Sequence, residues 1–328
     1  MDNVQVSNEQ HLAMYEEMLL ARRIDERMWL LNRAGSIPFV VSGQGQEVMQ
    51  VAASFALDKE VDYILPYYRD LAVVLHFGMT TRDIFLMAYG KAEDPNSGGR
   101  QMPNHFGQKK NRIVTQSSPV TTQVPHAAGI ALAAKMEGKS LVSFATMGEG
   151  STNQGDFHEG LNFAGVHKLP AIFMVENNKY AISVPLSKQV ACENIADRAI
   201  GYGMPGIKVD GNDPVAVYQA VKEARDRALN GDGPTLIEAE SYRLTPHSSD
   251  DDDMTYRTKE EVDYEKSIDG LLQYRKKLME EGILTEDKER EMEEKLKQEI
   301  NEATDYAEKA ASPDPKTLQD FVYSEEGF

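Results

Sequence analysis

Residues 140–183 read SLVSFATMGEGSTNQGDFHEGLNFAGVHKLPAIFMVENNKYAIS, and this stretch predicts the fold of the chain. Residues 140–146 and 171–175 are apolar runs with the composition of β-strands. Between them, Phe157, Leu161 and Ala164 recur at i, i+4 and i+7, which places them on one face of a helix. Strand, turn, helix and strand make a βαβ unit, and such a unit belongs to a parallel sheet. We therefore expect an α/β fold with a doubly wound, mostly parallel sheet.

The turn after the first strand is rich in glycine, which suits a phosphate group. Glycine lets the backbone approach a phosphate closely, and a helix N-terminus favours negative charge. One interpretation is a dinucleotide site, because Gly148, Gly150 and Gly155 form a GxGxxxxG pattern, longer than GxGxxG. Glu176 would then be the ribose-binding acid at the end of the second strand. A second interpretation is an ordinary glycine turn of an α/β protein.

A third interpretation is a magnesium diphosphate site. Mg²⁺ prefers octahedral oxygen ligands and takes only a few of them from protein, with phosphates and water completing the set. Glu149 can supply a carboxylate from one strand end, Asn178 an amide oxygen from the next, and Tyr180 its backbone carbonyl. A carboxylate inside a dinucleotide turn would repel the pyrophosphate. Glu149 therefore favours the metal site over the dinucleotide site.

The GEG…NN spacing of residues 148–178 resembles the thiamine diphosphate motif. Five segments also stand in the order expected of the alpha subunit of 2-oxo acid dehydrogenases, which belongs to the first component of a multienzyme complex. They are GRQMPNHFG (99–107), TQSSPVTTQVPHAAG (115–129), GDFHEGLNFAG (155–165), ENNKYAIS (176–183) and YRLTPHSSDDDD (242–253). The GEG start, GRQMP and the SSPxxTQxP run are more similar to the branched-chain enzyme than to the pyruvate enzyme. The resemblance covers residues 10–275.

The resemblance assigns most of the candidate site residues. It implies a thiamine diphosphate-binding fold, with the cofactor held by Tyr68, Arg69, Ser118, Val120, Gly148, Glu149, Gly150, Ser151, Asn178 and His247. It implies Mg²⁺ at Glu149, Asn178 and Tyr180, and it suggests K⁺ at Ser117, Pro119, Thr122 and Gln123. Without the resemblance, Arg69 can clamp a phosphate or form a surface salt bridge. The hydroxyls of residues 117–122 can equally cap the helix expected over residues 119–136.

His247 is the candidate catalytic residue among seven histidines. It lies in a polar Pro-His-Ser-Ser loop, where a proton donor can be positioned and tuned, and its counterpart in the family lines the active site. We expect most of the other histidines to be structural. The acidic run at residues 250–253 is either a flexible solvated loop or a segment that orders the His247 loop through Arg243.

Two positions depart from the family pattern. Glu176 stands where the branched-chain enzymes of animals carry a basic residue, so one phosphate contact is expected to be missing. Pro246 stands where that group has a second histidine. Neither change removes an expected metal ligand. Both weaken the inference of substrate preference from the family to this chain.

The resemblance implies a reaction and a set of partners. Thiamine diphosphate chemistry decarboxylates a 2-oxo acid, here those of Val, Leu and Ile, and the acyl unit passes to the lipoyl group of an acyltransferase core. In the family, the carboxylate that activates the aminopyrimidine lies on a separate beta subunit, in an α2β2 heterotetramer. The alternatives are the pyruvate or acetoin version of this subunit and, in a different class, a dinucleotide-binding protein without thiamine chemistry.

Composition excludes some classes of protein. Lys+Arg 35 against Asp+Glu 53 gives a net charge of −18, which argues against a nucleic-acid partner and against an anionic membrane surface. The sequence contains no run of 18 apolar residues, so no membrane span is predicted. The single cysteine, Cys192, excludes an internal disulfide framework and suits a reducing compartment. The first residues, MDNVQVSNEQ, lack the features of a signal or transit peptide, so we expect a cytoplasmic protein.

We expect three parts along the chain: an N-terminal helical arm at 1–35, the cofactor-binding α/β domain at 36–255, and a C-terminal helical extension at 256–328. Helices are expected over residues 9–34, 259–281 and 285–311, with Thr285 as an N-cap. The last of these helices carries a narrow apolar stripe, formed by Met292, Leu296, Ile300, Ala303 and Ala307. The C-terminal helices are therefore either a solvated tail or a docking element.

Overall fold

The computed structural model describes residues 6–320 and 322–323, and all structural statements refer to these residues. The α-helices are α1 Asn8–Arg33, α2 Glu47–Phe55, α3 Leu71–His76, α4 Thr81–Ala88, α5 Gln123–Met136, α6 Gly155–His167, α7 Pro214–Leu229, α8 Lys259–Ser267, α9 Gly270–Glu280 and α10 Glu286–Lys309. The strands are β1 Tyr63–Leu65, β2 Ser143–Gly148, β3 Ala171–Asn177, β4 Tyr180–Ala181, β5 Val184–Pro185, β6 Gly206–Asp210 and β7 Thr235–Glu240. Short 3-10 helices are η1 Lys109–Asn111, η2 Glu149–Asn153, η3 Leu186–Lys188, η4 Ile195–Tyr202, η5 Asp253–Thr255 and η6 Pro315–Gln319.

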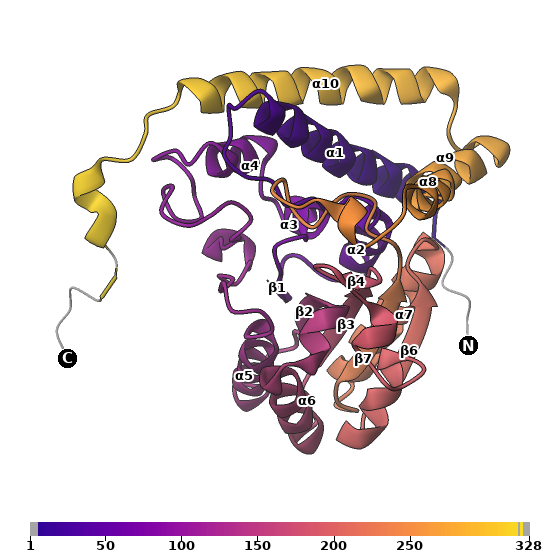
Figure 1. Cartoon of the computed structure of the whole chain (residues 1–328). Coiled ribbons are helices and arrows are strands. Elements are labelled where there is room, and N and C mark those ends of the chain that lie inside the picture. Colours follow the sequence, from indigo (N-terminus) through magenta and orange to yellow (C-terminus); the bar gives the residue numbers. More distant parts are fainter. Residues whose placement is uncertain (1–5, 321, 324–328) are drawn as a thin grey trace.

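The expected parallel sheet is present, in the order β1-β2-β3-β7-β6 (Figure 1). Every neighbouring pair in it is parallel. The βαβ unit read from the sequence is β2-α6-β3, in which Gly148 lies opposite Glu176. Because the strands are parallel, the ends of β2 and β3 meet at one edge of the sheet, where α/β proteins bind their ligands.

Side chains of β3 alternate between two hydrophobic cores, as a period of two requires. Ile172 and Met174 join the core built with α1, α2 and α7. Ala171, Phe173 and Val175 join the core built with α5 and α6. Helices therefore cover both faces of the sheet, and the expected doubly wound α/β architecture is confirmed (Figure 1).

The helical ends of the chain pack on the same core. Helix α1 contacts α2, α3, α9 and α10, and α10 lies along it (Figure 1). Thr285 caps α10 as expected, since its side chain accepts a hydrogen bond from the Lys288 N–H. The stripe residues Leu296, Ile300, Ala303 and Ala307 are buried, so α10 is not a solvated tail. The division at residues 35 and 255 remains a prediction, as does a docking role for the C-terminal helices.

Three expected boundaries were wrong. The helix expected over 259–281 is two helices, because Asp269 leaves the helical conformation, caps α9 through Leu271 N–H and binds Arg22. The helix expected from 119 begins at Gln123, after Thr121 with φ 80. The strand expected from 140 pairs only from Ser143. Each difference reflects a contact with distant residues or a local turn.

None of the described helices combines the length and the apolar character that crossing a membrane requires.

Candidate active site

A cavity of about 350 Å³ opens at the end of β2 and β3. Its lining consists of Tyr67, Tyr68, Arg69, Val120, Gly148, Glu149, Gly150, Ser151, Gln154, Asn178, Tyr180, Ala181, Ile182 and His247. All residues expected to bind the cofactor are in this lining except Ser118. The Ser118 hydroxyl instead lies 2.7 Å from Nε2 of His105, outside the lining. The structure thus brings together segments that lie up to 180 residues apart in the chain.

The floor of the cavity is the turn from β2 into η2. Gly150 packs against the short β4-β5 hairpin, and a Cβ added at this position would lie 2.5 Å from the Cβ of Ala181. The third residue of this turn, Ser151, is tied to Thr121, whose hydroxyl donates to its carbonyl at 3.1 Å. The glycine is therefore required by the close approach of two loops, and their packing fixes the backbone beside Glu149.

Glu149 is buried at the cavity wall, with 1% of its surface exposed. Burial raises the pKa of its carboxyl group, and a hydrogen bond from Gln189 Nε2 at 3.2 Å, together with the Asn178 N–H, opposes this rise. Of the two consecutive asparagines, Asn177 is structural, because it donates to Glu238 at 2.7 Å. Asn178 faces the cavity. A buried carboxylate with few donors around it is suited to a cation.

The expected magnesium ligands therefore converge, and their chemistry fits the ion. Glu149 offers a carboxylate, Asn178 an amide oxygen and Tyr180 a carbonyl, all from the cavity lining. The Tyr180 carbonyl also accepts from Arg243 at 3.1 Å, which leaves its second lone pair for a metal. No group of three or more His, Cys, Asp and Glu side chains able to hold a metal occurs among the described residues. Such a sparse ligand set suits Mg²⁺ that keeps water and phosphate oxygens.

Arg69 is a buried guanidinium on the opposite wall. It donates to the Ser42 carbonyl at 2.7 Å, to Nδ1 of His247 at 2.9 Å and to the His247 carbonyl at 3.0 Å. Tyr68 stacks below it, with 5.1 Å from the guanidinium carbon to the ring centre. A guanidinium has five N–H donors, so two remain for an anion in the cavity. The clamp role is therefore supported, and the alternative of a surface salt bridge was wrong.

The contact with Arg69 fixes the tautomer of His247. Since a guanidinium can only donate, Nδ1 of His247 must accept, and the neutral ring carries its proton on Nε2. Burial, followed by the charges of Arg69 and Arg243, lowers the pKa of His247 to about 4. At neutral pH the ring is therefore a neutral donor held beside an anion clamp.

This environment predicts a pH dependence of stability. The folded pKa of His247 lies below its unfolded value of 6.5, so the stabilisation is complete above pH 6.5 and is lost as the pH falls towards 4. We expect wild-type unfolding free energy, measured by urea titration, to fall more steeply over this range than that of His247→Gln. The glutamine keeps an acceptor for Arg69 but does not titrate. Parallel curves for the two proteins would contradict the assignment.

The acidic run after His247 is ordered and is not a solvated loop. Asp251 accepts from the His247 N–H at 2.7 Å and from the Tyr256 hydroxyl at 2.5 Å. Arg243 donates to the same hydroxyl at 2.8 Å, and to the Ile182 carbonyl at 2.8 Å. The interpretation that Arg243 orders the His247 loop is therefore supported. Arg243 acts through the Tyr256 hydroxyl and not by a direct ion pair with an aspartate.

Glu176 is neither a ribose-binding acid nor a surface residue. It is fully buried, and its Oε2 accepts from Gln50 at 2.9 Å and lies 3.1 Å from the Tyr67 hydroxyl. Burial and the neighbouring Glu176 carboxyl raise the pKa of Asp70 well above its usual range, and burial also raises the pKa of Glu176. The dinucleotide interpretation was therefore wrong about this residue.

The expected K⁺ ligands are only partly assembled. The Ser117 hydroxyl donates to the Pro119 carbonyl at 2.9 Å and contacts the hydroxyl of Thr122. The Nε2 of Gln123 donates to the Thr146 carbonyl at 2.8 Å. Three oxygens thus lie close together, while the fourth residue joins helix α5 to the sheet.

Other polar side chains, which sequence reasoning missed, complete the site. Tyr67, Gln154 and Gln189 line or border the cavity, and Gln46 bonds Asn178 from behind it. The signal for Gln46 was its glycine-rich neighbourhood, SGQGQE at residues 42–47. Two histidines outside the cavity have structural partners, Tyr274 for His11 and Glu17 for His76.

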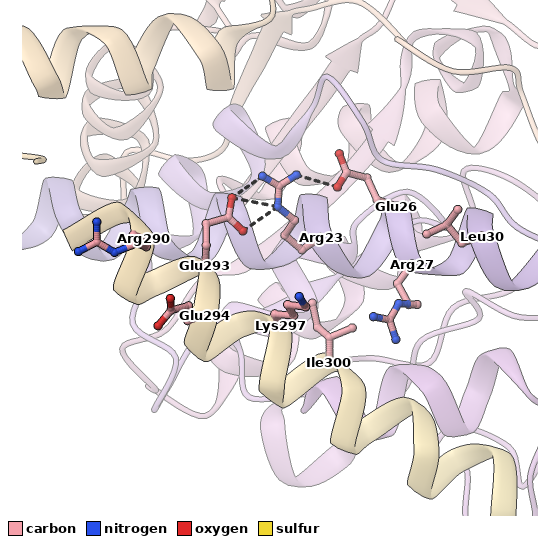
Figure 2. A pocket seen from close by; sticks show the side chains of 9 residues that line it. All are labelled: Arg23, Glu26, Arg27, Leu30, Arg290, Glu293, Glu294, Lys297 and Ile300. Atoms are coloured by element: carbon pink, nitrogen blue, oxygen red, sulfur yellow. Dashed lines mark hydrogen bonds and ion pairs between the residues drawn. The ribbon is translucent and has the colours of Figure 1, made fainter. Parts of the chain in front are cut away.

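A second cavity of about 320 Å³ lies between α1 and α10 (Figure 2). Two of its acids, Glu293 and Glu26, accept from Arg23. Arg27 donates to Asn301, outside the lining, at 2.6 Å. No residue of the βαβ unit lines it, so it is a seam between two helices.

The fold and the cavity together define a class of protein. The chain matches the Dehydrogenase E1 component family over residues 15–316, and it belongs to this family. It is 66% identical over 319 residues to the 2-oxoisovalerate dehydrogenase subunit alpha of Bacillus subtilis (strain 168), and the match covers 97% of each chain. It is 42% identical over 322 residues to the pyruvate dehydrogenase E1 component subunit alpha of Staphylococcus aureus (strain Mu50 / ATCC 700699), which covers 98% of this chain and 84% of the relative. The resemblance read from the motifs is confirmed.

Proposed function

We propose that this chain is the alpha subunit of a branched-chain 2-oxo acid dehydrogenase (3-methyl-2-oxobutanoate dehydrogenase). It decarboxylates the 2-oxo acids of Val, Leu and Ile with thiamine diphosphate and passes the acyl unit to a lipoyl-bearing acyltransferase. The observation that carries the proposal is the cavity, where Arg69, Glu149 and Asn178 converge at the strand ends. The branched-chain assignment is supported by 66% identity to a 2-oxoisovalerate enzyme against 42% to a pyruvate enzyme.

The residues of this chain hold the diphosphate half of the cofactor. When bound, thiamine diphosphate supplies the carbon nucleophile and the electron sink for decarboxylation. Arg69 would donate to the diphosphate, while Glu149, Asn178 and the Tyr180 carbonyl would hold its Mg²⁺. The turn through Gly150 would offer backbone N–H groups to the phosphates. His247 would present Nε2–H as a neutral donor for proton or acyl transfer. Ser118 would need to leave His105 to contact the cofactor, and a K⁺ ion would hold the loop of residues 117–122.

The cavity is incomplete for this chemistry, which is why we include a beta subunit. Glu149 is the one carboxylate among the described lining residues, and it belongs to the metal site. The acid that activates the aminopyrimidine must then come from a partner. Apolar side chains at and beside the cavity are exposed, namely Val120 at 42%, Ile182 at 57% and Val184 at 41%. An α2β2 interface covering them would bury more than ~2,000 Å², as obligate interfaces do.

The substrate is tested by assaying the chain co-purified with its beta subunit. We expect kcat/KM for 3-methyl-2-oxobutanoate to exceed that for pyruvate about tenfold or more, since each missing methylene in an apolar pocket costs a factor of this order. 2-Oxoglutarate serves as the charged control substrate. A preference for pyruvate would transfer the assignment to the pyruvate enzyme and reject the branched-chain one.

A cytoplasmic location also remains a prediction. It is supported by the single cysteine, Cys192, which is unpaired and half-buried, as suits a reducing compartment.

A further inference from the structure

Gln46 lies behind the cavity, at the residue before α2, and it is fully buried. Its Oε1 is 3.0 Å from Nδ2 of Asn178 and 2.9 Å from the hydroxyl of Tyr67. We propose that Gln46 is a positioning residue that fixes the amide of Asn178, so that the oxygen of Asn178 faces the metal. The proposal rests on the proposed magnesium role of Asn178.

The two ends of the Asn178 amide make different contacts. Its Nδ2 is taken by Gln46, so Oδ1 is the end left for the cavity that Asn178 lines. That oxygen accepts only a long contact of 3.4 Å, from the Tyr180 N–H. If the acceptor behind Nδ2 were lost, the amide could rotate and present its N–H groups to the cation. An N–H group cannot ligate Mg²⁺, which requires oxygen.

Tyr67 extends this arrangement by one step. Its hydroxyl has one proton, for which Oε1 of Gln46 and Oε2 of Glu176 compete at 2.9 and 3.1 Å. A cation at the Asn178 oxygen requires Nδ2 to point at Gln46, and therefore requires Gln46 to present oxygen. With oxygen there, the Tyr67 proton has an acceptor on the side of Gln46. Metal, asparagine, glutamine and tyrosine thus form one hydrogen-bonded chain of fixed direction.

The unpartnered end of Gln46 supports a role beyond stability. Its Nε2 is buried and has no hydrogen-bond partner among the described residues. A buried donor without a partner destabilises a fold, and such groups in native proteins call for an explanation. Both contacts of the side chain are made by its oxygen, which is the atom that the proposed role requires.

The loop that carries Gln46 is held by α1. Asp25 accepts from the Ser42 hydroxyl at 2.8 Å and from the Gly43 N–H at 2.9 Å. Arg22 binds Glu47, which follows Gln46, at 2.5 Å. Gly45 has φ +92 and lies so close to Tyr242 that an added Cβ would be 2.1 Å from its carbonyl oxygen. Because Ser42 also accepts from Arg69, one rigid loop supports both the phosphate clamp and the metal ligand.

The test compares Mg²⁺ affinities in the assembly of this chain with its beta subunit. Mg²⁺ is titrated calorimetrically at saturating thiamine diphosphate, so the readout does not depend on turnover. Gln46→Met keeps the size of the side chain but removes the acceptor, and we expect the apparent Mg²⁺ dissociation constant to rise about 10- to 100-fold, as for other outer-shell partners. Gln46→Glu retains an acceptor and should bring the constant back towards the wild-type value.

The matched control is Gln108→Met. Gln108 is a buried glutamine whose Oε1 also accepts from an asparagine amide, that of Asn111, away from the cavity. This variant should lose the same kind of hydrogen bond and keep wild-type Mg²⁺ affinity. Should Gln46→Met fail to fold, Tyr67→Phe carries the test, and we expect a weaker affinity in the same direction.

The outcomes distinguish a failure of the positioning role of Gln46 from a failure of the proposed function. Wild-type Mg²⁺ affinity in Gln46→Met, or in Tyr67→Phe where that variant carries the test, would overturn the positioning role. Equal losses in Gln46→Met and Gln46→Glu would also overturn it, because the acceptor would then not matter, as would an equal loss in Gln108→Met. Absence of any Mg²⁺-dependent cofactor binding in the wild-type assembly would reject the proposed function, and this role with it.

Discussion

Glu149→Gln should abolish magnesium-dependent binding of thiamine diphosphate and leave the fold intact. Glu149 is the only charged ligand of the proposed metal set among the described residues. Removing its charge should therefore weaken Mg²⁺ binding more than the about 10- to 100-fold that is typical when a residue hydrogen-bonded to a metal ligand is changed. Burial already raises the pKa of this carboxyl group, so removing its charge relieves a desolvation cost. The melting temperature without ligand should therefore be unchanged or higher. Calorimetric titration with cofactor, with and without Mg²⁺, measures the effect.

Glu238→Gln is the control for this change. Glu238 is also buried, on strand β7, where it accepts from Asn177 and from the Ala196 N–H at 3.0 Å. It does not line the cavity, so its variant should keep the magnesium dependence. Unchanged cofactor affinity in Glu149→Gln would sink the metal assignment.

Arg69→Lys should weaken the binding of thiamine diphosphate and not that of thiamine. A lysine keeps the positive charge but has only three N–H donors on one nitrogen, so holding the Ser42 carbonyl and both atoms of His247 would leave none for the diphosphate. Hydrogen bonds to charged groups contribute about 1.5–3 kcal/mol each. The loss of one such bond to the diphosphate therefore predicts a roughly 10- to 100-fold weaker binding of the cofactor. Separate titrations with thiamine and with its diphosphate isolate this contribution.

Arg82→Lys provides the comparison. Arg82 stacks on Tyr306 at 4.2 Å, much as Arg69 stacks on Tyr68, but it lies outside the lining of the cofactor cavity. Its variant should bind both ligands like the wild type. Equal weakening of thiamine and thiamine diphosphate by Arg69→Lys would mean that Arg69 supports the loop and does not clamp the diphosphate.

Local patterns were sufficient to predict the parallel sheet and the expected metal ligands at its strand ends. The continuous apolar run of β3 and the helical spacing of α6 are short-range features, and both were confirmed by the structure. Glu149 and Asn178 follow from the position of strand ends, which a βαβ unit places at one edge. The sequence suggested a phosphate clamp for Arg69 and a proton donor for His247, but only the resemblance placed both at the cofactor, because nothing local joins residues 178 positions apart.

What the sequence could not predict depends on long-range contacts. The break between α8 and α9 follows from Asp269 binding Arg22, 247 residues away. Gln46 contacts Asn178 across 132 residues, and no periodicity marks that pairing. Ser118 was expected at the cofactor, yet its hydroxyl contacts His105, a preference decided by loop packing. Glu176 was the ribose-binding acid of the dinucleotide interpretation, and it is instead buried beside Asp70.

The central claim is that this chain holds the diphosphate and the metal, while a second subunit completes the site. It is tested most directly by measuring CO₂ release from 3-methyl-2-oxobutanoate with thiamine diphosphate, Mg²⁺ and an artificial electron acceptor. Three samples are compared: this chain alone, the beta subunit alone, and the two together. We predict release from the mixture only, with the chain alone binding the cofactor weakly. Full decarboxylation by the purified chain, with no second polypeptide in its mass spectrum, would contradict the account.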